Sequence, residues 1–390
     1  MTNYELFYQK MVDLGMETKV AKGYCKKFQH DEESFPVSDM SQREWAIRRG
    51  FYPGNIEYYG LNDGNVQDYL PDFKYFMMHP LNNHFRVWLG DKLTTKYVFN
   101  GSGCEDMMPD YYVYVENDGS FTYLMDCPAE IQKDENFLLN LLKRQKILAM
   151  KPNSGTSGGL GFIKLEYKDG EIYKNNKLIN MEQFWEMQNS MRNYIITEWC
   201  YQHKDLAKVW PDSECALRVI MFKKVKNSPF AGSEWKCALS YARFGTDKSG
   251  GTSNVSSGGV GVPFNYETGE YDDFSVRFKW FTEDGQVKQF CHPDTKYVWK
   301  GNKLPNWEKV KEGIYRICQH IDSLSFLGLD IIITEESMKI CEINTKPSMT
   351  LPQYMQGPVL IDDDAKAYFE SKGLNKIDCN KLWEAYLQCQ

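Results

Sequence analysis

The stretch Leu327-Gly-Leu-Asp-Ile-Ile-Ile-Thr-Glu-Glu-Ser-Met-Lys-Ile-Cys-Glu-Ile-Asn-Thr-Lys-Pro347 is the segment around which this chain is organised. It holds two short apolar runs, Ile331–Thr334 and Lys339–Ile343, on either side of the polar turn Glu335–Ser337. Apolar runs of this length joined by a polar turn predict a β-hairpin.

Polar side chains at the ends of this hairpin predict a metal site. We expect Asp330 to open the first strand, and Glu342 and Asn344 to close the second. Glu342 and Asn344 point to the same face, because side chains alternate along a strand. Two carboxylates and an amide oxygen suit Mg²⁺, which proteins hold through a few carboxylates and the phosphates of a substrate. The alternative is a surface hairpin with acidic ends.

Length and composition are those of an ordinary globular protein. The 390 residues suffice for two or three domains, and 25% of them are charged. The net charge of −7 argues against a nucleic-acid partner, which requires a basic face. Eleven cysteines without a Cys-x-x-Cys pair favour a reducing compartment and give no zinc site. Met1–Val20 lacks the apolar core of a signal peptide and no run reaches membrane-spanning length, so we expect a cytoplasmic protein.

Two segments rich in glycine and serine predict anion-binding loops. The first, Asn153–Gly161, follows a predicted strand, Ile147–Met150, and precedes another, Phe162–Tyr167. Glycine lets the backbone turn with its N–H groups exposed to phosphate, and Lys151 adds a cation. No Gly-Lys-Ser/Thr follows, so this is not a Walker loop. The second segment, Gly250–Gly261, is also flanked by strands, which favours anion binding over the alternative of a flexible linker.

Cationic side chains lie on several other predicted elements. A helix is expected to begin near Gly90-Asp-Lys, with Asp91 as its N-cap and Lys92 in its first turn. Arg218 lies inside the strand Ala216–Phe222, and Arg243 ends the strand Cys237–Ala242. Buried cations need a partner, either an anionic substrate or an acid of the chain itself. Further predicted elements are a hairpin around Asp118-Gly119, a strand ending at Glu198, and helices over 136–146, 308–321, 365–372 and 381–387.

The order of these motifs resembles that of the ATP-grasp superfamily, which includes D-alanine–D-alanine ligase, biotin carboxylase and the ribosomal-protein glutamate ligase. The resemblance extends from Gly90 to Gln353. Within the superfamily, His292-Pro-Asp-Thr, Leu304-Pro-Asn-Trp307 and Glu342-Ile-Asn-Thr-Lys-Pro … Gln353 look like the sugar-transfer-associated group, which is linked to cell-surface polysaccharide synthesis.

The resemblance implies an α/β (α+β) fold in which two subdomains clasp ATP. It divides the chain into an N-terminal domain (1–110), a small lid subdomain (111–197), a large subdomain with the Mg²⁺ site (198–360) and a C-terminal helical tail (361–390).

The resemblance also implies the residues that bind ATP and Mg²⁺. Lys92 and Lys151 match the two phosphate-binding lysines, and Glu198 matches the hinge acid, with the backbone near Trp199 and Tyr201 at the adenine. Asp205 falls at the spacing of the ribose acid. The loop that closes over the phosphates contains Ser154, Gly155, Ser157, Gly158 and Gly159. The Mg²⁺ ligands, for two expected ions, are Asp330, Glu342 and Asn344.

Arg218, Arg243 and Asn254 resemble the Arg … Arg … Asn series of the glutamate-ligase branch, where these residues hold phosphate and acyl groups. One departure stands out. D-alanine–D-alanine ligase has an arginine two positions before its metal aspartate, and this chain has Gly328 there. In that ligase the arginine stabilises the oxyanion of the tetrahedral intermediate. We expect Arg243 or Arg218 to do so in this chain.

The activity implied is ATP-dependent ligation of a carboxylate to an amine through an acylphosphate. We expect a small-molecule or saccharide carboxylate and the amine of an amino acid or amino sugar, with a possible association with polysaccharide-synthesis enzymes that modify capsule, O-antigen or teichuronic-type polymers. The alternatives are a kinase acting on a sugar hydroxyl and a nucleotide-binding subunit without catalysis.

Overall fold

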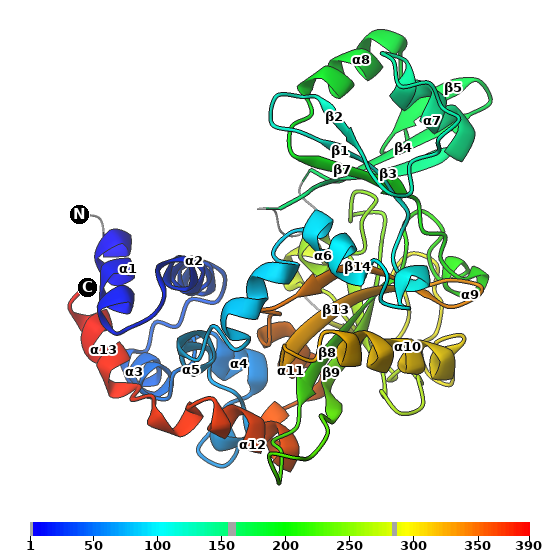
Figure 1. The fold of residues 1–390 in the computed structure, drawn as a ribbon. Helices are drawn as coiled ribbons and strands as arrows, with labels where there is room; N and C mark the ends of the chain where they lie inside the picture. The colour runs from blue at the N-terminus through cyan, green and yellow to red at the C-terminus, as the bar shows by residue number, and fades with distance from the viewer. Residues whose placement is uncertain (1–2, 155–160, 283–286) are drawn as a thin grey trace.

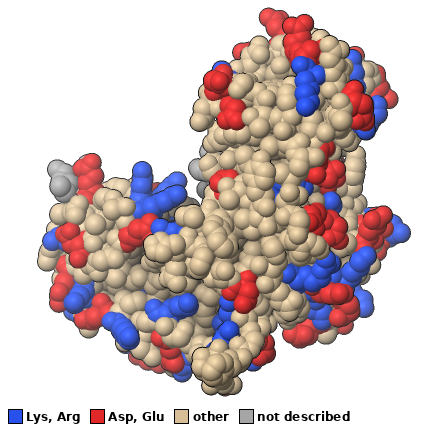
Figure 2. All heavy atoms as spheres, in the orientation of Figure 1, with Lys and Arg blue, Asp and Glu red and all other residues tan. Residues whose placement is uncertain are grey.

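The computed structural model describes residues 3–154, 161–282 and 287–390. It contains two antiparallel sheets of seven strands each, together with a lobe built from N-terminal and C-terminal helices (Figure 1). The expected mixed α/β class is confirmed. Figure 2 shows that the surface is hollowed between the helical lobe and the upper sheet. None of the described helices is long and apolar enough to cross a membrane.

The first sheet, at the top of Figure 1, has the strand order β2-β1-β7-β3-β4-β5-β6. The hairpin predicted around Asp118-Gly119 is its β1–β2 pair. Apolar residues of α7 (Phe137–Gln145) and α8 (Met181–Ser190) form the core with this sheet. Its strands are β1 (Tyr111–Val115), β2 (Phe121–Tyr123), β3 (Ile147–Pro152), β4 (Ile163–Lys168), β5 (Glu171–Lys174), β6 (Lys177–Ile179) and β7 (Tyr194–Glu198).

The second sheet has the order β12-β11-β10-β9-β8-β13-β14. One face packs on α10 (Trp307–His320), which contributes Val310, Ile314 and Ile317 to the core. The short helix α9 (Lys204–Ala207) lies between the sheets in sequence. The strands are β8 (Ala216–Lys223), β9 (Trp235–Phe244), β10 (Val260–Pro263), β11 (Ser275–Val276), β12 (Lys288–Gln289), β13 (Phe326–Ile333) and β14 (Met338–Asn344).

The β13–β14 pair is the hairpin predicted from the opening stretch, with one correction. Asp330 does not open the first strand, because β13 begins at Phe326 and is buried along its whole length. Asp330 is paired with Glu342, and Gly328 with Asn344. The register shifts after Asp330, since Ile331 pairs with Ile340 and Cys341 is left over as a β-bulge.

The helical lobe joins the two ends of the chain in one core. Phe7, Tyr24 and Phe73 share this core with Tyr368 and Trp383, although nearly the whole chain separates them in sequence. The α-helices of the lobe are α1 (Asn3–Asp13), α2 (Thr18–Ser34), α3 (Met40–Arg48), α4 (Asn55–Tyr59), α5 (Asp72–Met77), α11 (Thr350–Gln356), α12 (Asp363–Ser371) and α13 (Asn380–Leu387).

The lobe is also fixed to the second sheet. Ile220, Phe222 and Phe326, on β8 and β13, belong to its core. The side chain of Gln356, on α11, accepts a hydrogen bond from the backbone N–H of Ser240 on β9 at 2.6 Å. Ile220 and Phe222 alternate with Arg218 along β8, so the face of the sheet that carries Arg218 packs against the lobe farther along this strand.

The helix predicted from Gly90-Asp-Lys is α6 (Lys92–Phe99). The Asp91 side chain caps it by accepting a hydrogen bond from the backbone N–H of Thr94 at 2.7 Å. A 3₁₀ helix, η2 (Asn83–Leu89), connects α6 to the helical lobe. Lys92 is thus fixed in the first turn of a capped helix.

Gly328 permits a close approach that no other residue allows. A Cβ atom there would lie 2.6 Å from Cβ of Pro347, well inside van der Waals contact. Pro347 is itself fixed, since its carbonyl accepts a hydrogen bond from the Tyr75 hydroxyl at 2.5 Å. The segment after β14 therefore fills the space that an arginine side chain would need at this position.

We expect Gly328→Ala to destabilise the protein by about 1–3 kcal/mol, because the added methyl group overpacks a fixed contact. The measurement is the free energy of unfolding from urea titration. Gly232→Ala is the matched control, since a Cβ there meets no atom within 4 Å. Equal unfolding midpoints for the two variants would contradict the close packing of Pro347.

Candidate functional site

A cavity of about 310 Å³ lies between the two sheets. It is lined by residues of both sheets, of α6 and of the loop between β9 and β10. Ten of the residues singled out from the sequence line it: Lys92, Lys151, Glu198, Trp199, Arg218, Arg243, Asn254, Asp330, Glu342 and Asn344.

Strand pairing in the second sheet aligns the acids and the arginines. Asp330 on β13 is paired with Glu342 on one side and with Arg218 on the other. Arg218 donates to Asp330 through Nε at 2.5 Å and through Nη2 at 3.0 Å. Arg243 lies 3.2 Å from the same carboxylate. Asp330 is therefore held between two guanidinium groups.

These contacts determine the charge state of the pair. Burial by itself favours the neutral acid, but Arg218 and Arg243 outweigh it and keep the pKa of Asp330 below its ordinary value. Burial likewise opposes the charge on Arg218, and Asp330 raises the Arg218 pKa in spite of it. Both groups are ionised at neutral pH.

The oxygen atoms of Asp330, Glu342 and Asn344 are of the kind that binds Mg²⁺, although two arginines already contact Asp330. Asp330, Glu342 and Asn344 present hard oxygens on one face of adjacent strands. Nδ2 of Asn344 is buried and has no hydrogen-bond partner among the described residues, so either orientation of its amide is open to the cavity. The arginines already contact both oxygens of Asp330, which leaves Glu342 and Asn344 the freer ligands. Among the described residues, no three His, Cys, Asp or Glu side chains form a metal-binding group.

The two lysines approach the cavity from different elements. Lys92, on α6, lies 4.0 Å from Glu342 and donates to the Pro152 carbonyl at 3.1 Å. Burial lowers the pKa of Lys92, and Glu342 opposes that effect. Burial by itself would lower the pKa of Lys151. Nearby groups that can carry negative charge, Cys341 first among them, outweigh burial and raise this pKa. Lys151 therefore stays charged beside the cavity.

Asn153 connects the first glycine loop to α6. Its carbonyl accepts from the Lys92 backbone N–H at 3.2 Å, and its side-chain oxygen accepts from the Leu93 N–H at 3.0 Å. Ser154 lines a smaller cavity of about 90 Å³, which shares Lys92 and Glu342 with the larger one. The predicted loop residues Gly155, Ser157, Gly158 and Gly159 lie outside the described part of the chain.

Glu198 ends β7 at the rim of the cavity and has a partner that the sequence did not suggest. Lys339 on β14 lies 2.9 Å from its carboxylate, which also accepts from the Asp110 backbone N–H at 3.1 Å. This ion pair joins the first sheet to the β13–β14 hairpin of the second.

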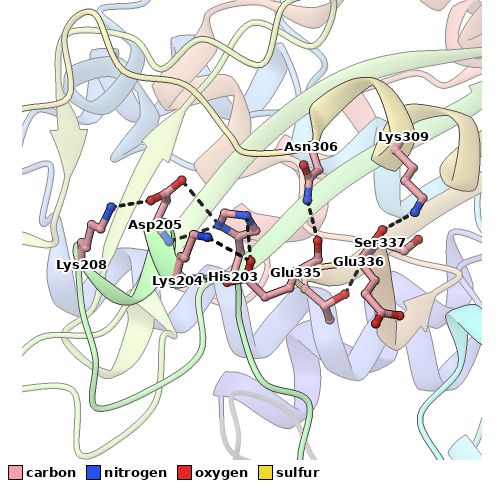
Figure 3. Close-up of polar contacts among 10 residues, drawn as sticks. His203, Lys204, Asp205, Lys208, Asn306, Lys309, Glu335, Glu336 and Ser337 are labelled. Carbon is pink, nitrogen blue, oxygen red and sulfur yellow. Dashed lines mark hydrogen bonds and ion pairs between the residues drawn. The ribbon is translucent and has the colours of Figure 1, made fainter.

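Two residues implied by the resemblance lie away from the cavity lining. Tyr201 is 62% exposed. Asp205, on α9, pairs with Lys208 at 2.6 Å and lies 3.7 Å from the ring of His203 (Figure 3). The same close-up shows Glu335, in the turn of the β13–β14 hairpin, accepting from the Lys204 backbone N–H at 2.7 Å. Asp205 therefore belongs to a surface cluster around that turn.

Glu214 is a cavity residue that was not predicted. Its Oε1 is buried without a hydrogen-bond partner among the described residues, and burial raises its pKa to about 7. The sequence held a signal for it, because Glu214, Ala216 and Arg218 alternate and all three line the cavity. An unpaired acid in this position is available to a ligand.

The second glycine loop brings a polar segment to the cavity. Gly250 and Gly251 have φ of 63° and 81°, a conformation that favours glycine. Asn254, farther along, accepts from Nη1 of Arg243 at 3.1 Å. The fully buried ring of His292, from the His-Pro-Asp-Thr motif, lies 2.8 Å from the Gly245 carbonyl at the start of this loop. That motif residue therefore supports the loop and does not line the cavity.

Comparison with known proteins gives a sequence match and more distant structural matches. The family model described as sugar-transfer associated ATP-grasp matches residues 77–367. A search of curated protein sequences finds no match.

Several solved structures resemble the chain at low sequence identity. The D-alanine–D-alanine ligase of Bacillus anthracis is 14% identical, with 79% of this chain and 68% of that one covered and a TM-score of 0.34. D-alanyl-alanine synthetase A of Vibrio cholerae O1 biovar eltor is 12% identical, with 76% of this chain and 66% of that one covered and a TM-score of 0.39. N5-carboxyaminoimidazole ribonucleotide synthetase, in its ADP complex, is 11% identical, with 73% of this chain and 57% of that one covered and a TM-score of 0.37.

Glu214 is expected to make folding less favourable as pH rises. Burial raises its pKa from 4.5 to about 7, so the folded protein keeps a proton that the unfolded chain releases. The stability is fully present below pH 4.5 and is lost as the pH rises through about 7. Glu214→Gln removes this titration, and the variant should gain about 1–3 kcal/mol relative to the wild type between roughly pH 5 and pH 8.

The measurement is urea unfolding across this pH range. Glu171→Gln, at an exposed position on β5, is the control and should follow the wild-type pH profile. If the Glu214→Gln profile also runs parallel to that of the wild type, Glu214 is not protonated in the folded state.

Proposed function

The chain belongs to the sugar-transfer associated ATP-grasp family, and on this premise we propose that it is an ATP-dependent ligase that joins a carboxylate to an amine. The observation that carries the proposal is the set of side chains around one cavity. Lys92 and Lys151, the row of Glu342 and Asp330, and the pair Arg218 and Arg243 all line it. A nucleotide-binding subunit without catalysis would not require the whole set.

ATP would lie with its base near Trp199 and its phosphates toward the lysines. Trp199 and Cys200 line the end of the cavity next to β7, and Lys151 lies on the neighbouring strand β3. We assign Glu214 to the ribose in place of Asp205, because its buried Oε1 has no hydrogen-bond partner among the described residues, and a carboxyl group can accept a hydroxyl hydrogen bond with or without its proton. Lys92 and Lys151 would neutralise charge on the phosphates.

Glu342 and Asn344, with Asp330, would hold Mg²⁺, which when bound supplies positive charge to the phosphate oxygens. The first chemical step is attack of a substrate carboxylate oxygen on the γ-phosphorus, which breaks the bond to the β-phosphate oxygen and releases ADP. The chain's part in this step is to align the two reactants and to stabilise the charge that spreads over the transferred phosphoryl group. Lys92 and Lys151 are placed for the second of these tasks.

The second step is attack of an amine on the acylphosphate, followed by loss of phosphate. Arg243 and Arg218 are the forked donors nearest the acid row, and Asn254 fixes the Arg243 guanidinium at 3.1 Å. We assign them to the acyl oxygen and to the departing phosphate. The negative charge on that oxygen is largest in the tetrahedral transition state, so donors already in place lower the barrier most there.

The substrates follow from the family description and remain part of the proposal. A saccharide carboxylate, such as that of a uronic acid, and the amine of an amino acid or amino sugar fit both the chemistry and a sugar-transfer association. The product would be an amide on a precursor of a surface polysaccharide, made in the cytoplasm beside the enzymes that assemble the polymer.

Mg-ATP at millimolar concentration should raise the melting temperature by a few degrees, because a ligand that binds only the folded state stabilises it. Lys151→Ala should lose most of this increase. Lys168→Ala is the control, since Lys168 is exposed at the far end of β4 and should keep it. An unchanged melting temperature with Mg-ATP in the wild type would refute nucleotide binding.

Hydroxylamine trapping distinguishes ligation from phosphorylation of a hydroxyl. With Mg-ATP, a carboxylate substrate such as a uronic acid, and no amine, the acylphosphate should be captured as a hydroxamate in proportion to ADP. A kinase would instead give a stable phosphorylated product. Release of ADP with phosphorylated sugar and no hydroxamate rejects the ligase.

The same assay tests the hairpin residues. Glu342→Gln should lower hydroxamate formation by orders of magnitude, since it removes a charge from the Mg²⁺ site without changing its shape. Glu335→Gln, in the turn of the hairpin, should retain most of it (Figure 3). Equal losses would assign the effect to the fold of the hairpin.

A further inference from the structure

A second group of cations lies where the helical lobe meets the end of the β13–β14 hairpin. Lys346 follows the Mg²⁺ candidate Asn344 by two residues, and Lys27 extends from α2. The two ammonium groups lie 5.2 and 5.6 Å from the centre of the same ring, that of Phe76. Lys27 also donates to the Ser348 hydroxyl at 3.2 Å. Both lysines are exposed.

The charges in this group are out of balance. The Lys346 ammonium group lies against α2, one helical turn before Lys27, because a Cβ atom at Gly23 would be 3.6 Å from it. Glu17 offsets part of this positive charge, but Arg86 already binds its carboxylate with two hydrogen bonds of 2.6 and 3.0 Å. Like charges gathered without matching acids are costly unless an anion joins them.

The other acid near Lys27 is occupied. Asp72 accepts from the amide of Asn55 at 2.7 Å and from the Thr350 hydroxyl at 3.2 Å. It is buried, and burial raises its pKa to about 6. Asp72 therefore supports the loop after β14 and only partly compensates Lys27.

The group lies next to the cavity residue Arg218. A Cβ atom at Gly328 would be 2.6 Å from Pro347, the neighbour of Lys346, and 3.6 Å from Cδ of Arg218, which lines the cavity. Arg86 lies on η2, the 3₁₀ helix that leads from the lobe to α6. Figure 2 shows Lys and Arg side chains gathered on the helical lobe beside the hollow that separates it from the upper sheet.

We propose that Lys27, Lys346 and Ser348 form a subsite for a second acidic group of the substrate, and that this subsite selects acidic sugars. One end of the sugar would react near Arg218 and Arg243, while a carboxylate or phosphate elsewhere on it lies between the two ammonium groups and the Ser348 hydroxyl. This inference rests on the proposed function and names the substrate class of that site.

A surface role alone does not account for this arrangement. Solvated lysines on a helix separate from one another, whereas these two come from segments more than three hundred residues apart in sequence and share one ring. The two ammonium groups are hydrogen-bond donors, and the Ser348 hydroxyl can donate its own hydrogen while it accepts from Lys27. An anion requires donors of this kind. The short segment from Asn344 to Ser348 ties their position to that of the β13–β14 hairpin.

The test is a thermal shift on protein saturated with Mg²⁺ and the β,γ-imido analogue of ATP, which occupies the phosphate site. D-glucuronate, D-glucose 6-phosphate and neutral D-glucose are added at equal concentration and ionic strength. We expect at least one acid to raise the melting temperature above the value with glucose by about 1–3 °C. The acid that does so identifies the group, carboxylate or phosphate, that the subsite prefers.

Lys27→Gln with Lys346→Gln should abolish this difference, and Lys27→Gln alone should reduce it by half or more. Lys26→Gln, which removes the same charge from the adjacent exposed position of α2, should leave it unchanged. The shift caused by the ATP analogue should survive in all variants, which shows that they fold and bind nucleotide.

Two results would overturn the subsite. One is a wild-type protein that responds to the ATP analogue but to neither acid more than to glucose. The other is a full acid response in the double variant. A wild-type protein that does not respond to the ATP analogue would instead reject the proposed function, so the two failures are distinguishable.

Discussion

The carboxylate of Asp330, held between Arg218 and Arg243, is the interaction on which the arrangement of the site depends. Removing one partner from a buried ion pair costs about 3–5 kcal/mol, so this group constrains the three strands that carry it. A shift of one residue between β8 and β13 would turn Arg218 to the opposite face and leave Asp330 unpaired. Because Glu342 is paired with Asp330, the same register also places the end of β14.

The sequence predicted the elements of the site well because its signals there are local. The predicted strands carried Glu198, Arg218, Glu342 and Asn344, the family resemblance marked them as site residues, and all four line the cavity. The N-cap at Asp91 placed Lys92 in a first turn, and the structure has the cap. These features depend on residues within a few positions of each other, and no tertiary contact overrides them.

The features that the sequence did not predict depend on contacts between distant segments or on local irregularity. The bulge at Cys341 alters the alternation along β14, which is why Cys341 and Glu342 both line the cavity. The partner of Glu198, Lys339, lies across the interface between the two sheets. Counting residues along an irregular loop pointed to Asp205, although the chain forms α9 before it returns to the cavity at Glu214. Loop geometry of this kind has no periodic signal.

The helical lobe has a consequence for how the protein is made. Its core unites Phe7, Tyr24 and Phe73 with Tyr368 and Trp383, so during translation the earlier residues lack these packing partners until α12 and α13 leave the ribosome. At about 5–20 residues per second, the intervening three hundred residues take roughly 15–60 s. During that interval the apolar side chains of the earlier helices lack part of their core, while both sheets are able to form. Folding of the lobe is therefore completed only after both sheets have been synthesised.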